Sequence, residues 1–142
     1  MKRPDIFIVE DDALLAWALG AQLEDLGYEV AGSASTAPEA VEAVLRLGPA
    51  LVLMDVRLAQ DTSGFDAAHA IRESSHVPIL FCTAYADLPG VADEVRRIRN
   101  VRLVGKPVDG RLLRRLLDEL LLVPARDERV GAGHSSGAFL SS

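Results

Sequence analysis

Five short apolar runs limit the folds that this chain can adopt. They cover residues 6–9, 28–31, 51–54, 77–83 and 101–104. The third run, Leu51–Met54, leads directly into a single carboxylate, Asp55. A continuous apolar run of this length between turn signals predicts a strand that is buried on both faces. Such strands are typical of parallel sheets that helices cover on both sides.

Segments with the apolar spacing of amphipathic helices separate these runs. They lie between residues 13 and 27, 36 and 48, 65 and 75, and 88 and 98, and from residue 109 onwards. Parallel neighbouring strands need a crossover connection, which is usually a helix and is almost always right-handed. The alternation therefore predicts an α/β fold with a doubly wound, five-stranded parallel sheet and five helices.

The length of 142 residues is enough for one domain with a hydrophobic core. From Pro124 onwards the composition shifts to Gly, Ser and Arg. We therefore expect one ordered domain at residues 1–123 and a mostly disordered tail at residues 124–142. An output domain needs at least about 50 residues, so none is expected after Val123.

Charge and hydropathy disfavour nucleic acid and membranes as partners. The net charge of −6 gives no general attraction to phosphate backbones or anionic lipids. No segment approaches the roughly 20 apolar residues of a membrane span, and the first apolar run is too short for a signal peptide. We therefore expect a cytoplasmic protein. Cys82 is the only cysteine, so a disulfide framework is excluded.

Polar residues end four of the five predicted strands. Glu10 and Asp11 follow the first strand, Asp55 follows the third, Thr83 ends the fourth, and Lys106 follows the fifth. Singly, each has an ordinary role as a helix cap, turn residue, strand residue or surface charge. Ligands of open α/β sheets bind outside the carboxyl ends of the strands, so the coincidence favours one shared site.

The residue types at this edge suit metal-assisted phosphoryl transfer. Three carboxylates in one place repel one another unless a cation joins them, and an all-oxygen site suits Mg²⁺. We expect Asp55 to act as the nucleophile and to form an aspartyl phosphate. Lys106 and the Thr83 hydroxyl are placed to bind phosphoryl oxygens, and few further groups are needed.

At these residues the sequence resembles the receiver domain of two-component response regulators, over about Asp5 to Val123. The resemblance implies a flavodoxin-like sheet with the strand order 2-1-3-4-5. It also implies a phosphoacceptor protein, not an enzyme, that receives its phosphoryl group from a phosphohistidine on a sensor histidine kinase or phosphotransfer protein. The signal would pass to a downstream protein through the fourth and fifth helices.

The same resemblance assigns the ligands of Mg²⁺. It implies that Asp11 and Asp55 bind the ion directly, that Glu10 binds it through water, and that the backbone carbonyl of Arg57 contributes a further oxygen. It also implies a cis peptide bond between Lys106 and Pro107.

The sequence departs from the common receiver pattern at the switch residues. Leu103 stands three residues before Lys106, where the family usually has Tyr or Phe. The segment Phe81–Tyr85 resembles the Phe-Ala-Thr-Gly-Tyr signature of an atypical receiver subfamily that also lacks this aromatic. Our hypothesis is that Tyr85, two residues after Thr83, replaces the missing aromatic as the reporter of phosphorylation.

Other functions fit the sequence less well. Haloacid-dehalogenase-like phosphatases need a second Asp two residues after the nucleophile, where this chain has Arg57. The glycine motifs of dinucleotide and P-loop sites are absent. The alternative that stays open is a receiver-like module that binds a partner, or forms a homodimer, without phosphorylation. Leu103 and the apolar run Leu120–Val123 favour it.

Overall fold

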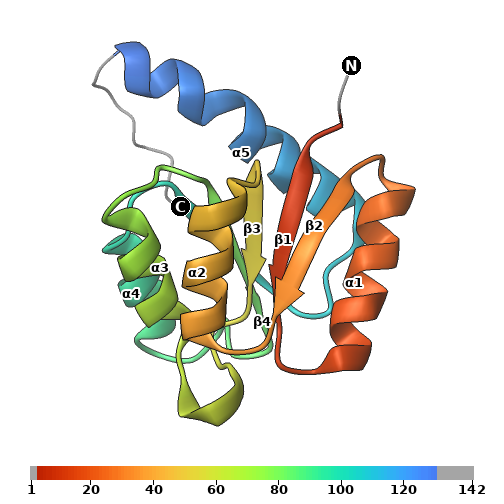
Figure 1. Ribbon diagram of the computed structural model, residues 1–142, viewed down its shortest axis with the longest axis vertical. Helices are drawn as coiled ribbons and strands as arrows, with labels where there is room; N and C mark the ends of the chain where they lie inside the picture. The colour runs from red at the N-terminus through yellow and green to blue at the C-terminus, as the bar shows by residue number, and fades with distance from the viewer. Residues whose placement is uncertain (1–2, 131–142) are drawn as a thin grey trace.

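Five parallel strands form one sheet at the centre of the molecule (Figure 1). The computed structural model describes residues 3–130 of the chain. The strand order β2-β1-β3-β4-β5 confirms the predicted topology. The strands are β1 (Asp5–Val9), β2 (Glu29–Ala34), β3 (Leu51–Met54), β4 (Ile79–Thr83) and β5 (Val101–Gly105).

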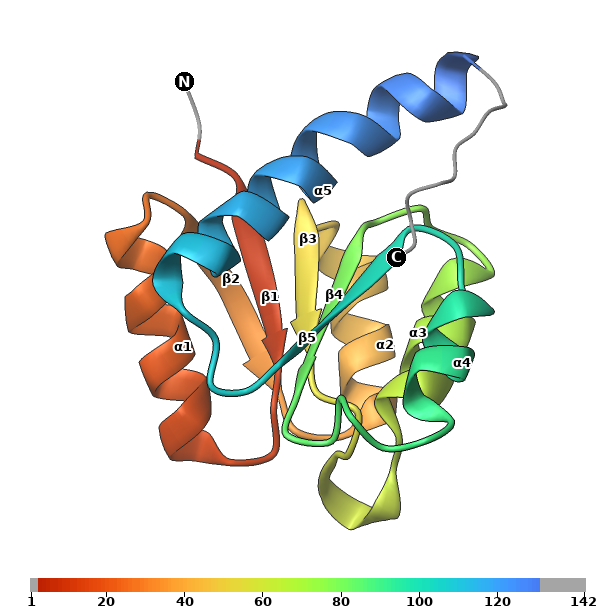
Figure 2. The same cartoon turned by 180° about the vertical axis from the view of Figure 1, so that it is seen from behind.

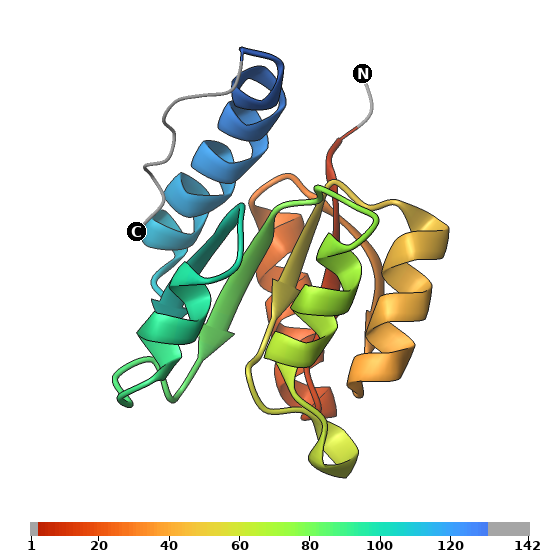
Figure 3. The same ribbon diagram turned by 90° about the vertical axis from the view of Figure 1, so that its left-hand side faces the viewer.

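Helices cover both faces of this sheet. Figure 1 shows α2, α3 and α4 on one face, and the view from behind in Figure 2 shows α1 and α5 on the other. In the side view of Figure 3, α5 and α2 lie on opposite sides of the strands. The helices are α1 (Ala13–Asp25), α2 (Ala37–Leu47), α3 (Gly64–Arg72), α4 (Val91–Arg96) and α5 (Gly110–Val130), with a short 3₁₀ turn η1 (Ala59–Asp61).

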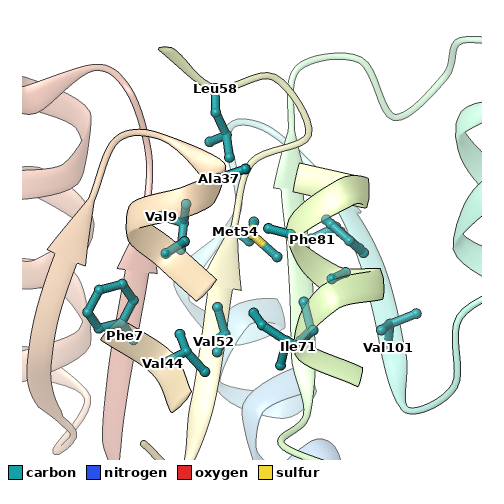
Figure 4. Packing of buried hydrophobic residues seen from close by; sticks show 14 of the residues in the cluster. Phe7, Val9, Ala37, Val44, Val52, Met54, Leu58, Ile71, Phe81 and Val101 are labelled. Carbon is teal, nitrogen blue, oxygen red and sulfur yellow. The ribbon is translucent and has the colours of Figure 1, made fainter. Parts of the chain in front are cut away.

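The sheet separates two hydrophobic cores because successive side chains of a strand point to opposite faces. Val52 and Met54 of β3 belong to the core beneath α2, α3 and α4. Figure 4 shows Val52 between Val44 of α2 and Ile71 of α3. Leu51 and Leu53 of the same strand belong to the core beneath α1 and α5. The central strand is therefore buried on both faces, as the apolar run predicts.

Side-chain caps begin α1, α2 and α3, and Asp109 Oδ1 accepts the N–H of Arg111 at 2.8 Å at the start of α5. Asp12 Oδ1 accepts the backbone N–H groups of Leu14 and Leu15 at 3.0 and 3.2 Å at the start of α1. Thr36 caps α2, and Ser63 caps α3 by accepting the N–H of Phe65. These caps satisfy backbone donors that have no partner inside the helix. They fix the chain direction immediately after β1 and before α3, where the candidate site residues lie.

The clearest differences from the predicted element boundaries are at α4, β2 and α5. α4 begins at Val91 and not at Leu88, because Gly90 before it has a left-handed φ of 92°. β2 continues to Ala34, since pairing with β1 outweighs the weak strand preference of Gly32 and Ser33.

α5 runs past Val123, where the sequence places the end of the ordered domain, and ends at Val130. Pro124 therefore does not end the helix, and most residues at 125–130 are good helix formers. The rest of the expected tail, residues 131–142, lies outside the described residues. Between residues 3 and 130, no helix combines the length and apolar character that a membrane span requires.

Candidate functional site

Four strands bring the predicted site residues to the carboxyl edge of the sheet. The ammonium nitrogen of Lys106, which follows β5, lies 2.6 Å from Glu10 Oε1 and 2.8 Å from Asp55 Oδ2. The side chains are largely buried, with exposed fractions of 17% for Lys106, 3% for Glu10 and 11% for Asp55. The predicted convergence of β1, β3 and β5 is therefore present as direct ion pairs.

The Asp55 carboxylate is held by both of its oxygens. Oδ2 accepts a hydrogen bond from Lys106, and Oδ1 accepts one from the backbone N–H of Val56 at 2.7 Å. Charge-assisted bonds of this kind are short and strong, so together they limit rotation of the carboxylate. The Val56 contact could not be found from residue types, because a backbone group makes it.

Three carboxylates at this edge have the chemistry of a divalent-cation site. Ligand oxygens of Glu10, Asp11 and Asp55 all lie within 4.8 Å of one another, which fits one hard cation bound by oxygen. Glu10 is buried, whereas Asp11 is exposed to incoming ligands. The set therefore suits Mg²⁺. The ligand role expected of the Arg57 carbonyl stays a prediction.

Burial and ion pairing shift the acid–base behaviour of Glu10 and Lys106 in specific directions. Desolvation by burial raises the pKa of Glu10, although its hydrogen bonds with Lys106 and with the N–H of Asp12 oppose this. Burial acts to lower the pKa of Lys106, but the hydrogen bonds with Asp55 and Glu10 outweigh it and hold that pKa above its ordinary value. Lys106 is therefore a permanent cation at neutral pH.

Thr83 lies at the end of β4 and is fully buried. Its hydroxyl oxygen accepts the backbone N–H of Tyr85 at 3.2 Å, and its carbonyl accepts the N–H of Lys106 at 3.0 Å. Thr83 thus joins the loop after β4 to the loop after β5. The peptide bond between Lys106 and Pro107 is cis.

A cation–π contact between two loops lies beside the site at the carboxyl edge of the sheet. The guanidinium carbon of Arg57 lies 4.2 Å from the ring centroid of Tyr85. This contact joins the loop after β3 to the loop after β4, and the sequence contains no local signal for a pair so far apart. Leu103, by contrast, is partly buried and packs against the core beneath α2, α3 and α4.

Comparison with protein families gives a match over most of the chain. The family described as response regulator receiver domain matches residues 6–118.

Two curated relatives are regulators by name. The phyllosphere-induced regulator PhyR of Methylorubrum extorquens is 42% identical over 84 residues, which are 58% of this chain and 32% of that protein. The transcriptional regulatory protein PdtaR of Mycobacterium tuberculosis is 32% identical over 136 residues, which are 96% of this chain and 64% of that protein. The chain therefore spans less than two thirds of either relative.

A solved structure has the same fold as this chain. The solution structure of the receiver domain of Erythrobacter litoralis PhyR superposes with a TM-score of 0.75 at 29% identity. The match covers 96% of this chain and 98% of that one.

Proposed function

This chain belongs to the response regulator receiver domain family, and from that premise we propose that Asp55 accepts a phosphoryl group from a phosphohistidine. The observation that carries the proposal is the placement of the Asp55 carboxylate. It is hydrogen-bonded by Lys106 and by the Val56 N–H, and its ligand oxygen lies within 4.8 Å of those of Glu10 and Asp11.

The transfer needs one nucleophile, and it needs positive charges that stabilise the phosphoryl oxygens. An Asp55 oxygen forms a bond to phosphorus while the bond from phosphorus to the histidine nitrogen breaks. The electron pair stays on the imidazole, which takes up a proton. Lys106 pairs with a phosphoryl oxygen, and the Thr83 hydroxyl donates to another. Mg²⁺ bound by Glu10, Asp11 and Asp55 would offset negative charge on the phosphoryl oxygens.

The proposed partners are those that membership of the receiver family implies. The donor is the phosphohistidine of a sensor histidine kinase or a phosphotransfer protein. The output is a changed contact with a downstream protein through α4 and α5, so the chain acts as a signalling phosphoacceptor and not as an enzyme with a separate substrate. Tyr85 is the proposed reporter, and its support is its backbone bond to Thr83 together with its contact with Arg57.

Labelling with a small phosphodonor tests the proposal. Wild type should take up phosphate in the presence of Mg²⁺ and lose the label when the ion is chelated, whereas Asp55→Asn should not be labelled. Asp25→Asn is the matched control, because Asp25 is an exposed residue at the far end of α1. Labelling of Asp55→Asn at the wild-type rate would contradict the proposal.

The alternative function is a module that binds a partner, or dimerises, without phosphorylation. Leu122 favours it, since its side chain on α5 is 66% exposed. A folded wild-type chain that takes up no label under any of these conditions would favour this alternative.

A further inference from the structure

We infer that Gly64 is a positioning residue for the Asp55 carboxylate and acts through the peptide bond between Asp55 and Val56. The inference rests on the proposed role of Asp55 as phosphoacceptor. Gly64 is the first residue of α3 and is buried, and it lies against the backbone that leaves β3. The sequence alone marks Ser63-Gly64 only as a turn.

The space beside Gly64 is too small for any side chain. A Cβ atom at this position would lie 3.1 Å from the carbonyl carbon of Asp55 and 3.2 Å from Met54 Cγ. It would approach the carbonyl oxygen of Asp55 far inside the 3.0 Å limit that real Cβ contacts respect. That oxygen belongs to the backbone, so it cannot move aside as a flexible side chain could. Gly64 is not among the glycines with positive φ, so the site demands space and not unusual backbone freedom.

The Asp55 carbonyl, which a Cβ at residue 64 would strike, lies in the same peptide unit as the N–H that orients the Asp55 carboxylate. The Asp55 carbonyl and the Val56 N–H belong to one planar peptide unit. This N–H donates to Asp55 Oδ1 at 2.7 Å. From the other side, the carbonyl of Val56 accepts the N–H of Gly64, also at 2.7 Å. Gly64 therefore fixes the peptide by close approach and fixes the next carbonyl by a hydrogen bond.

A methyl group at residue 64 must change this arrangement. Either the Asp55–Val56 peptide rotates or α3 shifts away from β3, and both movements displace the Val56 N–H from Asp55 Oδ1. The carboxylate then keeps the Lys106 bond but loses the bond that fixes its second oxygen. Misplacement of a nucleophile by about 1 Å costs up to roughly 100-fold in rate.

The test compares Gly64→Ala with Gly20→Ala. Gly20 lies within α1, and a Cβ there would lie 3.6 Å from Val30 Cγ2 and 3.8 Å from Ile8 Cδ1, which are ordinary contacts. Gly64→Ala should be labelled by a small phosphodonor roughly 10–100-fold more slowly than wild type at saturating Mg²⁺. Gly20→Ala should be labelled at the wild-type rate.

The NMR signal of the Val56 amide separates positioning from general destabilisation. In Gly64→Ala, the chemical shift of the Val56 amide proton should move towards the value of an amide proton that has no charged acceptor. In Gly20→Ala, this chemical shift should stay unchanged. A merely structural role would lower the melting temperature of Gly64→Ala without moving this signal. If Gly64→Ala does not fold, the coupling across the hydrogen bond from Val56 N to Asp55 Cγ is measured in wild type, and its absence overturns the inference.

The outcomes also separate this inference from the proposed function. If wild type and Gly20→Ala take up no label, the phosphoacceptor role fails, and the Val56 amide alone decides whether Gly64 positions the carboxylate. If wild type is labelled and Gly64→Ala is labelled equally fast with an unchanged Val56 amide, the inference is overturned while the proposed function stands.

Discussion

At the scale of single residues, the positive charge of Lys106 offsets the negative charges of Asp55 and Glu10. Its ammonium group lies between Glu10 and Asp55, and all three side chains are mostly removed from solvent. Removing one partner of such a buried group leaves an uncompensated charge, which is more costly than losing an exposed ion pair. Substitutions at Lys106 therefore change both stability and reactivity, so the reporting step is better tested at the more exposed Tyr85.

The reporter hypothesis predicts different results for two changes at Tyr85. Tyr85→Ala removes the ring that contacts Arg57 and should abolish the NMR shift changes that phosphorylation causes in α4. Tyr85→Phe keeps an aromatic face for the cation and should retain most of them. Both variants keep the backbone N–H that bonds Thr83, so they separate the ring from the loop. Unaltered shift changes in Tyr85→Ala would refute the hypothesis.

The side chains of the candidate site could be predicted from the sequence, but the contacts that orient them could not. Thr83 ends an apolar strand, and Glu10, Asp55 and Lys106 each follow one. Parallel strands have their carboxyl ends at one edge. The Val56 N–H and the space beside Gly64 are properties of the backbone path. These two features can be recognised only when the position of α3 relative to the end of β3 is known.

At the scale of elements, α4 is the shortest of the α-helices between residues 3 and 130 and begins without a side-chain cap. It has six residues, and Gly90 at its N-terminus provides no side-chain hydrogen bond. A link to α3 is the bond between His69 Nε2 and Glu94 Oε2 at 2.8 Å, and Arg97 bonds the other oxygen of Glu94 at 3.0 Å. The bounds of α4 were hard to predict, because residues with apolar helical spacing extend beyond both ends of the helix, which begins only after Gly90 and ends at Arg96.

The link between α3 and α4 should make the stability of the domain depend on pH. The hydrogen bond with His69 is the main cause of the lowered pKa of Glu94. A lowered carboxyl pKa contributes stability above its ordinary value of 4.5, and the contribution is lost as the pH falls through the lowered pKa. Glu94→Gln should therefore cost about 0.5 kcal/mol near neutral pH, and this cost should disappear as the pH falls through the lowered pKa of Glu94.

Urea denaturation of both proteins at several pH values measures this difference. Hydrogen exchange of the α4 amides should be faster in Glu94→Gln at neutral pH, because the link to α3 is weaker. Glu24→Gln, at an exposed position of α1, serves as the control and should change neither quantity. A cost that is the same at acid and neutral pH would show that the His69 bond is not its source.

At the scale of the whole molecule, folding itself creates the candidate cation site. Glu10 and Asp11 are far from Asp55 in the sequence, and their oxygens come within 4.8 Å only when β1 pairs with β3. The alternation of apolar runs and helices predicts that these ends share an edge. The strand order itself is implied by the family resemblance, because periodicity does not specify which strands are neighbours.

Mg²⁺ should therefore raise the melting temperature of the domain. An ion that binds only the folded state stabilises it by about 2.7 kcal/mol at a concentration of 100 times its Kd. Asp11→Asn should remove most of this effect without unfolding the protein, because Asp11 is exposed. Melting curves at matched ionic strength measure the shift.

Asp12→Asn is the control for this measurement, since Asn is as good an N-cap as Asp and the change removes an adjacent charge. It should keep the full response to Mg²⁺. An equal response in wild type and Asp11→Asn would exclude Asp11 as a ligand.

The ion pairs of Lys106 also have a mechanical consequence. The residue follows the edge strand β5, yet it is bonded to residues that follow β1 and β3, with β4 lying between. One side chain therefore links the end of β5 directly to the ends of β1 and β3. A force applied at the start of α5 would reach β1 and β3 through these ion pairs as well as through the backbone hydrogen bonds of β4 with β5 and β3. A change of charge at Asp55 would therefore change this direct link to the segment between β5 and α5 without a shift in strand register.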